Sequence, residues 1–276
     1  MMEETEFAFN GYNGTKIYAK KSLVNDPKAN IVIVHGIFEH LDRYDYLTKK
    51  LNDNGYNVYR YDARGHGRSE GKSGSLNDFN EYLYDLNIYV NLIRSDYPDE
   101  KVVLLGHSMG GLVATSYAIK YNNKLDYLVL SGACNQTPKV AKALKFIPTS
   151  LIPMIKYKNR LGKGVCGDPR VVEEYNSDPL VGKYASFKMM KNVFIKGCNY
   201  VNNNIRSISV PTLVMHGKKD GIVVSSTGEW TYNNLVVRDR TLKMYEGLYH
   251  EIFNEVKKDE VIKDLLNWLN KRLEEK

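Results

Sequence analysis

The chain of 276 residues is poor in cysteine, with only Cys134, Cys166 and Cys198, and no two of these have the CxxC spacing. An odd number of cysteines without that spacing provides neither a disulfide framework nor the thiolate pairs of a zinc site. The chain also has no uninterrupted apolar stretch long enough to span a bilayer, no internal repeat and no low-complexity linker. These absences argue against a disulfide-stabilised secreted domain, a zinc module, a helical membrane protein and a repeat protein.

A large excess of charge of one sign is missing as well. The 39 lysines and arginines stand against 32 aspartates and glutamates, so the chain is only mildly basic, at +7. A dedicated nucleic-acid-binding domain carries a larger excess, and we therefore expect no nucleic-acid partner. Near the N-terminus, Glu3, Glu4 and Glu6 occupy positions where a secretory signal peptide has positive charge and then an apolar run. With 43% hydrophobic residues, the composition predicts a soluble, folded, cytoplasmic protein.

What the sequence does contain is an alternation of short apolar runs with longer segments of helical periodicity. Several of the runs are continuously apolar, as expected of strands buried on both faces of a parallel sheet. The alternation predicts an α/β fold in which helices flank a mostly parallel central sheet. Helices are predicted at 44–54, 79–95, 109–121, 225–234 and 259–273. Strands are predicted in an opening hairpin at 7–9 and 17–19, and then at 31–34, 57–61, 102–105, 128–130, 213–215 and 242–245.

One segment, residues 134–207, separates two predicted strands by far more than an ordinary crossover. Five prolines divide it into short amphipathic pieces. We therefore predict a helical cap inserted into a core made of residues 1–133 and 208–276. The cap contains 13 lysines and arginines against 4 aspartates and glutamates, a net charge of +9. Its apolar residues between positions 144 and 155 are predicted to roof a pocket in the core.

A candidate nucleophile follows the predicted strand 102–105, where the sequence reads Gly106-His107-Ser108-Met109-Gly110-Gly111. This is a G-x-S-x-G pattern between a strand and a helix, the context in which the serine of a nucleophile elbow is found. The glycines allow the tight, strained turn that makes the serine hydroxyl project from the sheet. The first N–H groups of the following helix then point at a developing oxyanion. The pattern predicts Ser108 as the nucleophile, and a glycine-rich turn that only starts a helix is the alternative.

The catalytic base and acid are expected in loops at the carboxyl edge of the sheet. His250 follows the last predicted strand, and Asp220 follows the strand before it. The order Ser108, Asp220, His250 predicts a serine–histidine–aspartate triad. Asp126 and Glu246 are rival acids, and a solvated turn aspartate is the alternative role for Asp220. Four other histidines are predicted to be structural, bonding loop backbone: His35, His66, His107 and His216.

Two backbone N–H groups are predicted to form the oxyanion hole. In this architecture one donor is the residue after the nucleophile, Met109, and the other lies in the loop after strand 31–34. That loop reads His35-Gly36-Ile37-Phe38-Glu39-His40, and Ile37 is predicted as its donor. A simple His-Gly turn at the end of a strand is the alternative. The block at 62–69 has no obvious catalytic group and is predicted to support the oxyanion loop through hydrogen bonds.

Four blocks of sequence appear together in an order that is typical of one enzyme family. They resemble the monoacylglycerol lipase / lysophospholipase family of serine hydrolases over nearly the whole chain, most weakly over 134–207. The resemblance implies the α/β-hydrolase fold, the family's nucleophile, acid and base on Ser108, Asp220 and His250, and its oxyanion donors on Ile37 and Met109. The blocks are His35-Gly36-x-x-Glu39-His40-x-x-Arg43-Tyr44, Asp62-x-Arg64-Gly65-His66-Gly67-x-Ser69, Gly106-His-Ser108-Met-Gly-Gly111 and Leu242-Lys-x-Tyr245-Glu-Gly-x-Tyr249-His250.

The resemblance also implies residues that bind the substrate. Family members bind the glycerol hydroxyls with a Glu and an Arg of the first loop, which match Glu39 and Arg43 here. A salt bridge that braces the loop is the alternative role for this pair. Two positions depart from the family, because Phe253 stands where some members have a second histidine and Phe38 where a glycine is frequent.

The sequence therefore predicts hydrolysis of a lipid monoester, either a monoacylglycerol or a lysophospholipid, through an acyl-enzyme and without metal or organic cofactor. An esterase of a small soluble ester, such as a feruloyl esterase, or a peptidase would carry the same triad and differ in the cap. A non-catalytic binding protein of this fold is a further alternative, although such proteins usually lose a triad member.

The charge of the cap leads to one more prediction. The basic cap is expected to contact anionic membrane surface transiently, which would make the protein peripheral at membranes. A solvated lysine face that only aids solubility is the alternative. The basic residues concerned are Lys139, Lys142, Lys145, Lys156, Lys158 and Arg160.

Overall fold

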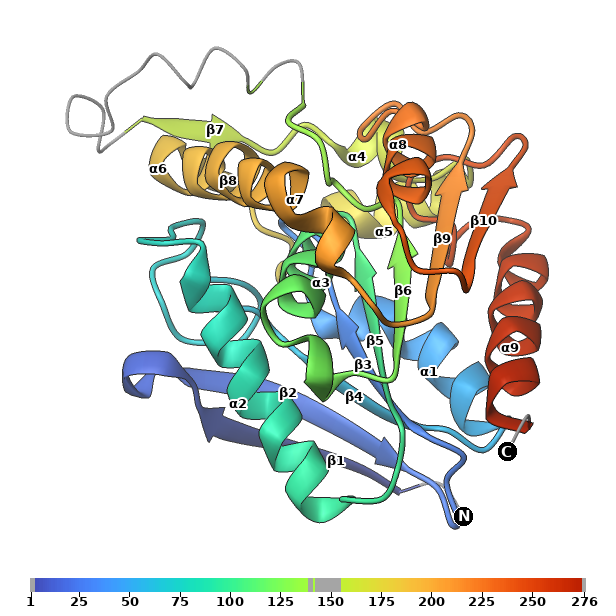
Figure 1. The fold of residues 1–276 in the computed structure, drawn as a ribbon. Coiled ribbons are helices and arrows are strands. Elements are labelled where there is room, and N and C mark those ends of the chain that lie inside the picture. Colours follow the sequence, from blue (N-terminus) through green and yellow to red (C-terminus); the bar gives the residue numbers. More distant parts are fainter. Residues whose placement is uncertain (1–2, 139–140, 142–154, 275–276) are drawn as a thin grey trace.

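A computed structural model describes residues 3–138, 141 and 155–274 of the chain, and in these ranges it confirms the predicted α/β fold. The central sheet contains β1 (Glu3–Asn10), β2 (Lys16–Leu23), β3 (Asn30–Val34), β4 (Asn57–Tyr61), β5 (Val102–His107), β6 (Tyr127–Ser131), β9 (Thr212–Gly217) and β10 (Arg240–Tyr245). Their order across the sheet is β1-β2-β4-β3-β5-β6-β9-β10 (Figure 1). The pairs β1–β2 and β2–β4 are antiparallel, and all other neighbours are parallel.

Helices cover the sheet on both faces (Figure 1). Side chains of β5 alternate between the two layers, since Val102 and Leu104 join one hydrophobic cluster whereas Val103 and Leu105 join the other. This is the period of two of a strand that is buried on both faces. The first cluster includes side chains of α2 (Asn80–Asp96), α3 (Met109–Lys120) and α8 (Ser226–Asn234), and the second those of α1 (Asp45–Asn52) and α9 (Lys258–Glu274).

The predicted elements outside 134–207 are all present, with shifts only at their ends. The largest shifts are in the opening hairpin, where β1 begins four residues earlier and β2 ends four residues later than predicted, and the helix predicted for 44–54 is also shorter. A 3-10 turn, Leu41–Tyr44, comes first, and α1 begins at Asp45. The Asp62 carboxylate accepts the Leu41 N–H at 2.7 Å, a contact from another strand end that periodicity does not reveal. Among the helices of the described ranges, none has the length and apolar content that crossing a membrane requires.

Residues 134–207, which we call the inserted segment, come between β6 and β9 in the chain, and their described part lies over the carboxyl ends of the parallel strands (Figure 1). The two short strands of this segment, β7 and β8, pair antiparallel and were not predicted, because three-residue strands carry no readable period. Its described elements are β7 (Lys156–Lys158), α4 (Gly162–Val165), α5 (Pro169–Ser177), β8 (Tyr184–Ser186), α6 (Phe187–Lys191), a π-helical stretch (Asn192–Gly197) and α7 (Cys198–Asn204).

Part of the predicted cap lies outside the described residues. This concerns the apolar residues at 144–154 together with Lys139, Lys142 and Lys145. Ile155, the last residue of that apolar run, is described and is 50% exposed.

Candidate active site

The turn between β5 and α3 holds Ser108 in a strained backbone conformation, with φ 55° and ψ −117°. A side chain on Gly106 would collide with the carbonyl oxygen of Gly110, and one on Gly110 with that of Val34. Since both obstacles are backbone atoms that cannot move aside, only glycine fits at either position. This geometry is that of a nucleophile elbow, and Ser108 lies at its apex.

Asp220 and His250 are brought together from the loops after β9 and β10. The Nδ1–H of His250 donates to Asp220 Oδ2 at 2.6 Å, and the N–H groups of Ile222 and Val223 donate to Asp220 Oδ1 at 2.9 Å each. Burial opposes ionisation of Asp220, but His250 and then the hydrogen bond from His216 hold the pKa of this carboxyl well below its usual range. Burial also disfavours charge on His250, whereas the Asp220 carboxylate outweighs it and raises the pKa of the imidazole.

His216, predicted to be a structural histidine that bonds loop backbone, also bonds the Asp220 carboxylate. Its Nε2 lies 3.0 Å from Asp220 Oδ2 and 2.8 Å from the carbonyl oxygen of Val223. A carboxylate and a carbonyl only accept, so Nε2 carries the proton. The spacing of four residues between His216 and Asp220 was the available signal. Asp220 thus accepts four hydrogen bonds, which fix its position.

The rival acids lie elsewhere. Asp126 accepts the Val102 N–H at 2.9 Å, at the amino end of β5 and therefore at the opposite edge of the sheet. Glu246 is exposed and pairs with Lys218 at 2.5 Å. Of the three candidate acids, only Asp220 bonds His250.

The turn Ser131–Gly132, at the end of β6, contacts both Ser108 and His250, which are 142 positions apart in the sequence. The Ser108 N–H donates to the carbonyl oxygen of Ser131 at 3.0 Å. The next residue, Gly132, has φ 52°, and a side chain there would lie 3.2 Å from His250 Nδ1. Gly132 thus makes room for the imidazole beside the elbow, a role that no local motif indicates.

Both residues predicted to supply oxyanion donors are close to Ser108 in the chain or in the cavity wall. Met109 is the first residue of α3, where N–H groups have no acceptor within the helix. Ile37 belongs to the loop after β3 and lines the same cavity as Ser108. The next residue, Phe38, is buried and has φ 69°, a conformation in which the glycine frequent in the family would be unstrained.

The buried carboxylate of Glu39 fixes the loop after β3 through hydrogen bonds. Its Oε2 accepts the Gly36 N–H at 3.1 Å and the Tyr44 hydroxyl at 2.7 Å, and its Oε1 lies 3.5 Å from His107 Nε2. Burial opposes ionisation of the carboxyl, but His107 and Arg43 outweigh it and lower the pKa of Glu39 to about 2. Glu39 is 4% exposed, so it meets protein atoms rather than solvent.

Arg43 is also buried, and its partner comes from the far end of the chain. Its Nη2 donates to Glu251 Oε2 at 2.5 Å, and its guanidinium lies 4.9 Å from the centre of the Tyr175 ring. Asn254 donates to the same Glu251 oxygen at 2.9 Å. Glu251 adjoins His250, so this ion pair joins the first loop to the loop of the candidate base.

The block at 62–69 supports the first loop, as expected from the sequence. Besides its bond to Leu41, Asp62 accepts the Arg68 N–H at 2.8 Å. The Ala63 N–H donates to His35 Nε2 at 2.9 Å. These contacts attach both ends of the loop, at His35 and Leu41, to the residues that directly follow β4.

A small apolar cavity of about 70 Å³ opens at Ser108. Core residues of the first loop and of the loop after Asp220 form part of its wall, and the inserted segment supplies the rest. Neither Glu39 nor Arg43 lines it. The lining residues are Ile37, Phe38, Ser108, Cys134, Pro138, Ala141, Tyr157, Leu161, Met190, Phe194, Ile222 and Val223.

The sheet order, the elbow and the Asp220–His250 pair define a serine hydrolase of the α/β-hydrolase fold. Residues 25–257 match the family model described as "Serine aminopeptidase, S33". The chain belongs to this family, which includes the monoacylglycerol lipases that it resembles, and it is a carboxylic ester hydrolase.

The similar proteins span almost the full chain. It is 32% identical over 270 residues to a monoacylglycerol lipase of Mycolicibacterium smegmatis, covering 96% of each chain. It is 31% identical over 255 residues to a monoglyceride lipase of Rattus norvegicus, covering 90% of this chain and 84% of the relative. Among solved structures, the monoacylglycerol lipase of Paleococcus ferrophilus superposes with a TM-score of 0.80 at 29% identity, covering 92% of this chain and 98% of that one.

Proposed function

We propose that the chain hydrolyses the ester of a lipid monoester, a monoacylglycerol or a lysophospholipid, with Ser108 as nucleophile. The observation that carries this proposal is the apolar cavity at Ser108, whose wall has aliphatic, aromatic and sulfur-containing side chains but no charged one among the described residues. An acyl chain matches such a wall, because its transfer from water is favourable and needs no polar partner. The names of the similar lipases support the same substrate class.

In the proposed mechanism His250 takes the Ser108 proton while the serine oxygen attacks the ester carbonyl carbon. Its Nδ1–H is held by Asp220, so Nε2 has the free lone pair that a general base needs. The N–H groups of Ile37 and Met109 donate to the oxyanion of the tetrahedral intermediate. His250 then protonates the leaving alcohol, and water activated by the same imidazole hydrolyses the acyl-enzyme.

We propose a bracing role for Glu39 and Arg43 rather than contact with the glycerol hydroxyls. Their hydrogen bonds to Gly36, Tyr44 and Glu251 account for both side chains without a substrate. Through Gly36, Glu39 would set the position of the neighbouring Ile37 N–H.

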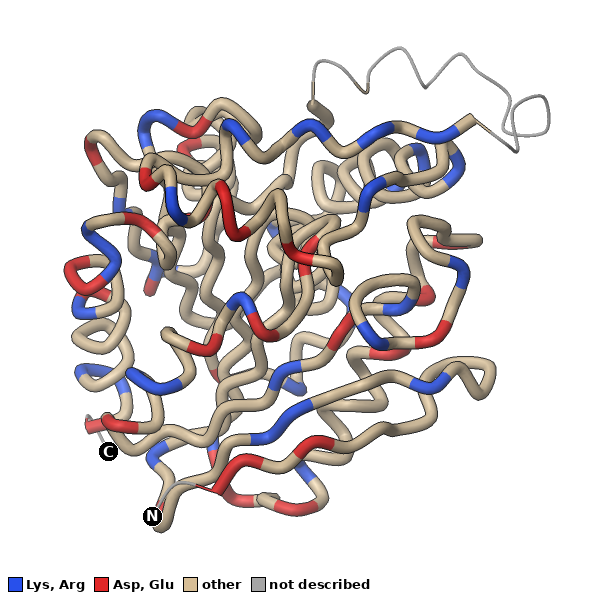
Figure 2. Tube along the Cα trace, turned by 180° about the vertical axis from the view of Figure 1, so that it is seen from behind, with Lys and Arg blue, Asp and Glu red and all other residues tan. Residues whose placement is uncertain are grey.

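We propose that the reaction takes place in the cytoplasm. The inserted segment acts as a cap that transiently contacts anionic membrane surface. The net charge of +9 on residues 134–207 supports this arrangement. Figure 2 shows lysines and arginines recurring along the described part of the segment, at the top of the view. Substrate would then enter the cavity from the lipid phase.

The proposal is tested with a fluorophosphonate probe and a matched substrate panel. Ser108→Ala should lose both labelling and ester hydrolysis, and Asp220→Asn should lower kcat by orders of magnitude because it favours the wrong imidazole tautomer. Ser116→Ala is the matched control, since Ser116 is a buried serine of α3, the helix that follows Ser108, and lies outside the cavity. Retained labelling in folded Ser108→Ala would refute the mechanism.

The panel compares a monoacylglycerol, a lysophospholipid and a p-nitrophenyl ester of the same acyl chain. We expect kcat/KM for a lipid monoester to exceed that for a short soluble ester. A clear preference for the soluble ester would instead indicate an esterase of small soluble esters, and a preference for a peptide would indicate a peptidase.

A further inference from the structure

Two hollows lie along the inserted segment, apart from the cavity of Ser108. The chain segment 157–163 separates the larger hollow from that cavity, because Tyr157 and Leu161 line the Ser108 cavity whereas Lys158, Arg160 and Lys163 line the larger hollow. The larger hollow measures about 640 Å³ and the smaller about 330 Å³. Both are lined by the stretch 181–184, so the two hollows adjoin along this part of the inserted segment, and we refer to them together as the trough.

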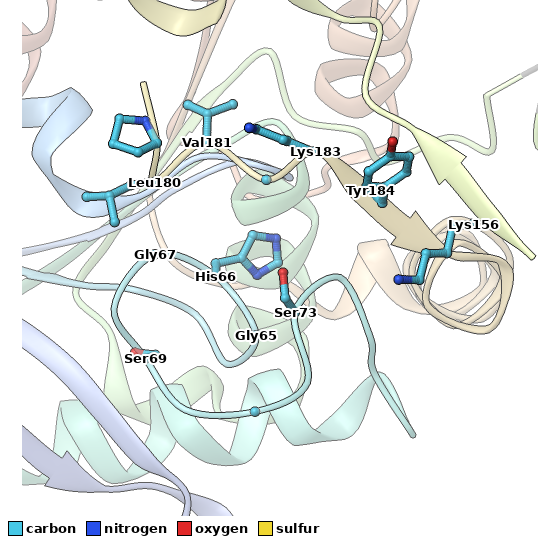
Figure 3. A pocket seen from close by; sticks show the side chains of 13 residues that line it. Gly65, His66, Gly67, Ser69, Ser73, Lys156, Leu180, Val181, Lys183 and Tyr184 are labelled. Carbon is cyan, nitrogen blue, oxygen red and sulfur yellow. The ribbon is translucent and has the colours of Figure 1, made fainter. Parts of the chain in front are cut away.

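Five cationic side chains line this trough, and we call it the cationic trough: Lys156, Lys158, Arg160, Lys163 and Lys183. Figure 3 shows the smaller hollow, with Lys156, Lys183 and Tyr184 on one side and the loop of His66 and Ser73 on the other. That hollow has no acidic residue in its lining. The larger one has a single acid, Asp178, whose carboxylate is already engaged by His40 Nε2 at 2.7 Å and by the Leu180 N–H at 2.8 Å.

These five cations have no carboxylate partner within 4.0 Å among the described residues. The stretch 139–154, which borders the trough in sequence and of which only Ala141 is described, contains neither Asp nor Glu. Several exposed cations elsewhere in the molecule are paired, as Lys49 is with Asp53 and Lys218 with Glu246. Like charges gathered in a hollow repel one another and raise the local concentration of anions. The trough therefore lacks the counter-charge that a bound anion would supply.

We propose that the cationic trough binds the phosphate group of a phosphate ester. Phosphate carries between one and two negative charges near neutral pH and offers several acceptor oxygens, which suits several cations that converge from two sides. Arg160 adds a planar fork that can bond two phosphate oxygens at once. The volume admits the polar group that carries the phosphate, such as glycerol. None of the five residues lines the cavity of Ser108, so this site is distinct from the hydrolytic one.

The phosphate can belong to a soluble ester or to the head group of a lipid in a membrane. Isothermal titration of the full chain with sn-glycerol 3-phosphate and with inorganic phosphate tests the first source. Co-sedimentation with phosphatidylglycerol vesicles, compared with phosphatidylcholine vesicles, tests the second. We expect saturable binding in at least one arm, weakening as sodium chloride is raised because salt screens these exposed charges.

The variant Lys158→Gln/Arg160→Gln/Lys183→Gln should weaken that binding at least tenfold. The matched control Lys257→Gln/Lys263→Gln/Lys271→Gln removes the same charge from exposed positions on and beside α9, outside both hollows, and should leave binding unchanged. Equal losses in the two variants, or no saturable binding in either arm, would overturn the proposal. Hydrolysis of a soluble p-nitrophenyl ester by the trough variant checks that the Ser108 site is intact, so failure of this site and failure of the proposed function are told apart.

Discussion

At the scale of single residues, the acid of the candidate triad is held by more than its catalytic partner. His216 and the N–H groups of Ile222 and Val223 all donate to Asp220. His250, and then the hydrogen bond from His216, favour the ionised form of the carboxyl, which is why its pKa stays low although the group is buried. A carboxylate fixed in this way keeps the His250 imidazole in one tautomer and one orientation.

The buried ion pair between Arg43 and Glu251 leads to the first prediction at this scale. Arg43→Ala should lower the free energy of unfolding by about 3–5 kcal/mol, because it leaves the Glu251 charge buried without its partner. Activity should fall by the same factor on a monoacylglycerol and on a p-nitrophenyl ester of equal chain length. Urea unfolding and parallel kcat/KM measurements check the two parts.

A selective loss of monoacylglycerol turnover would contradict this prediction. It would mean that Arg43 leaves Glu251 to contact the glycerol hydroxyls, which is the role that the family resemblance implies. Lys49→Ala is the control for the removal of a cation, since Lys49 pairs with Asp53 on the exposed surface of α1 and such pairs contribute little.

At the scale of elements, the strand–turn–helix unit of β5 and α3 depends on close backbone approach. The Cβ of an alanine at 110 would collide with the carbonyl oxygens of Val34 and His35, both in backbone that the sheet holds in place. Gly110→Ala should therefore destabilise the protein by at least about 3 kcal/mol or displace the elbow, with loss of activity in either case.

Gly221→Ala is the matched control for this prediction, because a side chain at 221 would meet nothing within 4 Å. Its free energy of unfolding should change by less than about 0.5 kcal/mol. If urea unfolding gave the same stability for Gly110→Ala as for Gly221→Ala, and activity were kept, the close contact between α3 and β3 would not exist in solution.

At the scale of the whole molecule, three buried histidines make stability depend on pH. Burial lowers the pKa of His35, His66 and His107 to about 4, from an ordinary value of 6.5. Between these pH values the three imidazoles are protonated in the unfolded chain but stay neutral in the native state. The free energy of unfolding therefore falls as the pH drops from about 6.5 to 4. His250 acts in the opposite direction, because its pKa is raised.

We therefore expect the free energy of unfolding to be several kcal/mol lower at pH 5 than at pH 7, with roughly 2 kcal/mol from each of the three histidines if the shifts hold in full. Urea denaturation at the two pH values measures the difference. His66→Phe should reduce the pH dependence by about one third of that effect. A stability that is equal or higher at pH 5 would show that these rings are protonated in the native state.

The sequence by itself determined the order of elements and the elbow, because both depend on neighbours along the chain. Apolar runs specify strands buried on both faces, and the glycines around Ser108 specify a turn that only glycine permits. Chain order then placed Asp220 and His250 at the same sheet edge, since the carboxyl ends of parallel strands meet there. Their 2.6 Å contact agrees with that placement.

Tertiary structure alone decided which side chains hold the site in place. Arg43 and Glu251 are 208 positions apart, and His40 and Asp178 are 138 apart, so no local period or motif connects them. The same is true of the cationic trough, where Lys183 joins the residues 156–163 only because β7 pairs with β8. Contacts of this kind depend on which core loops meet at the edge of the sheet and on how the inserted segment folds back onto it, and local sequence preference does not encode that approach.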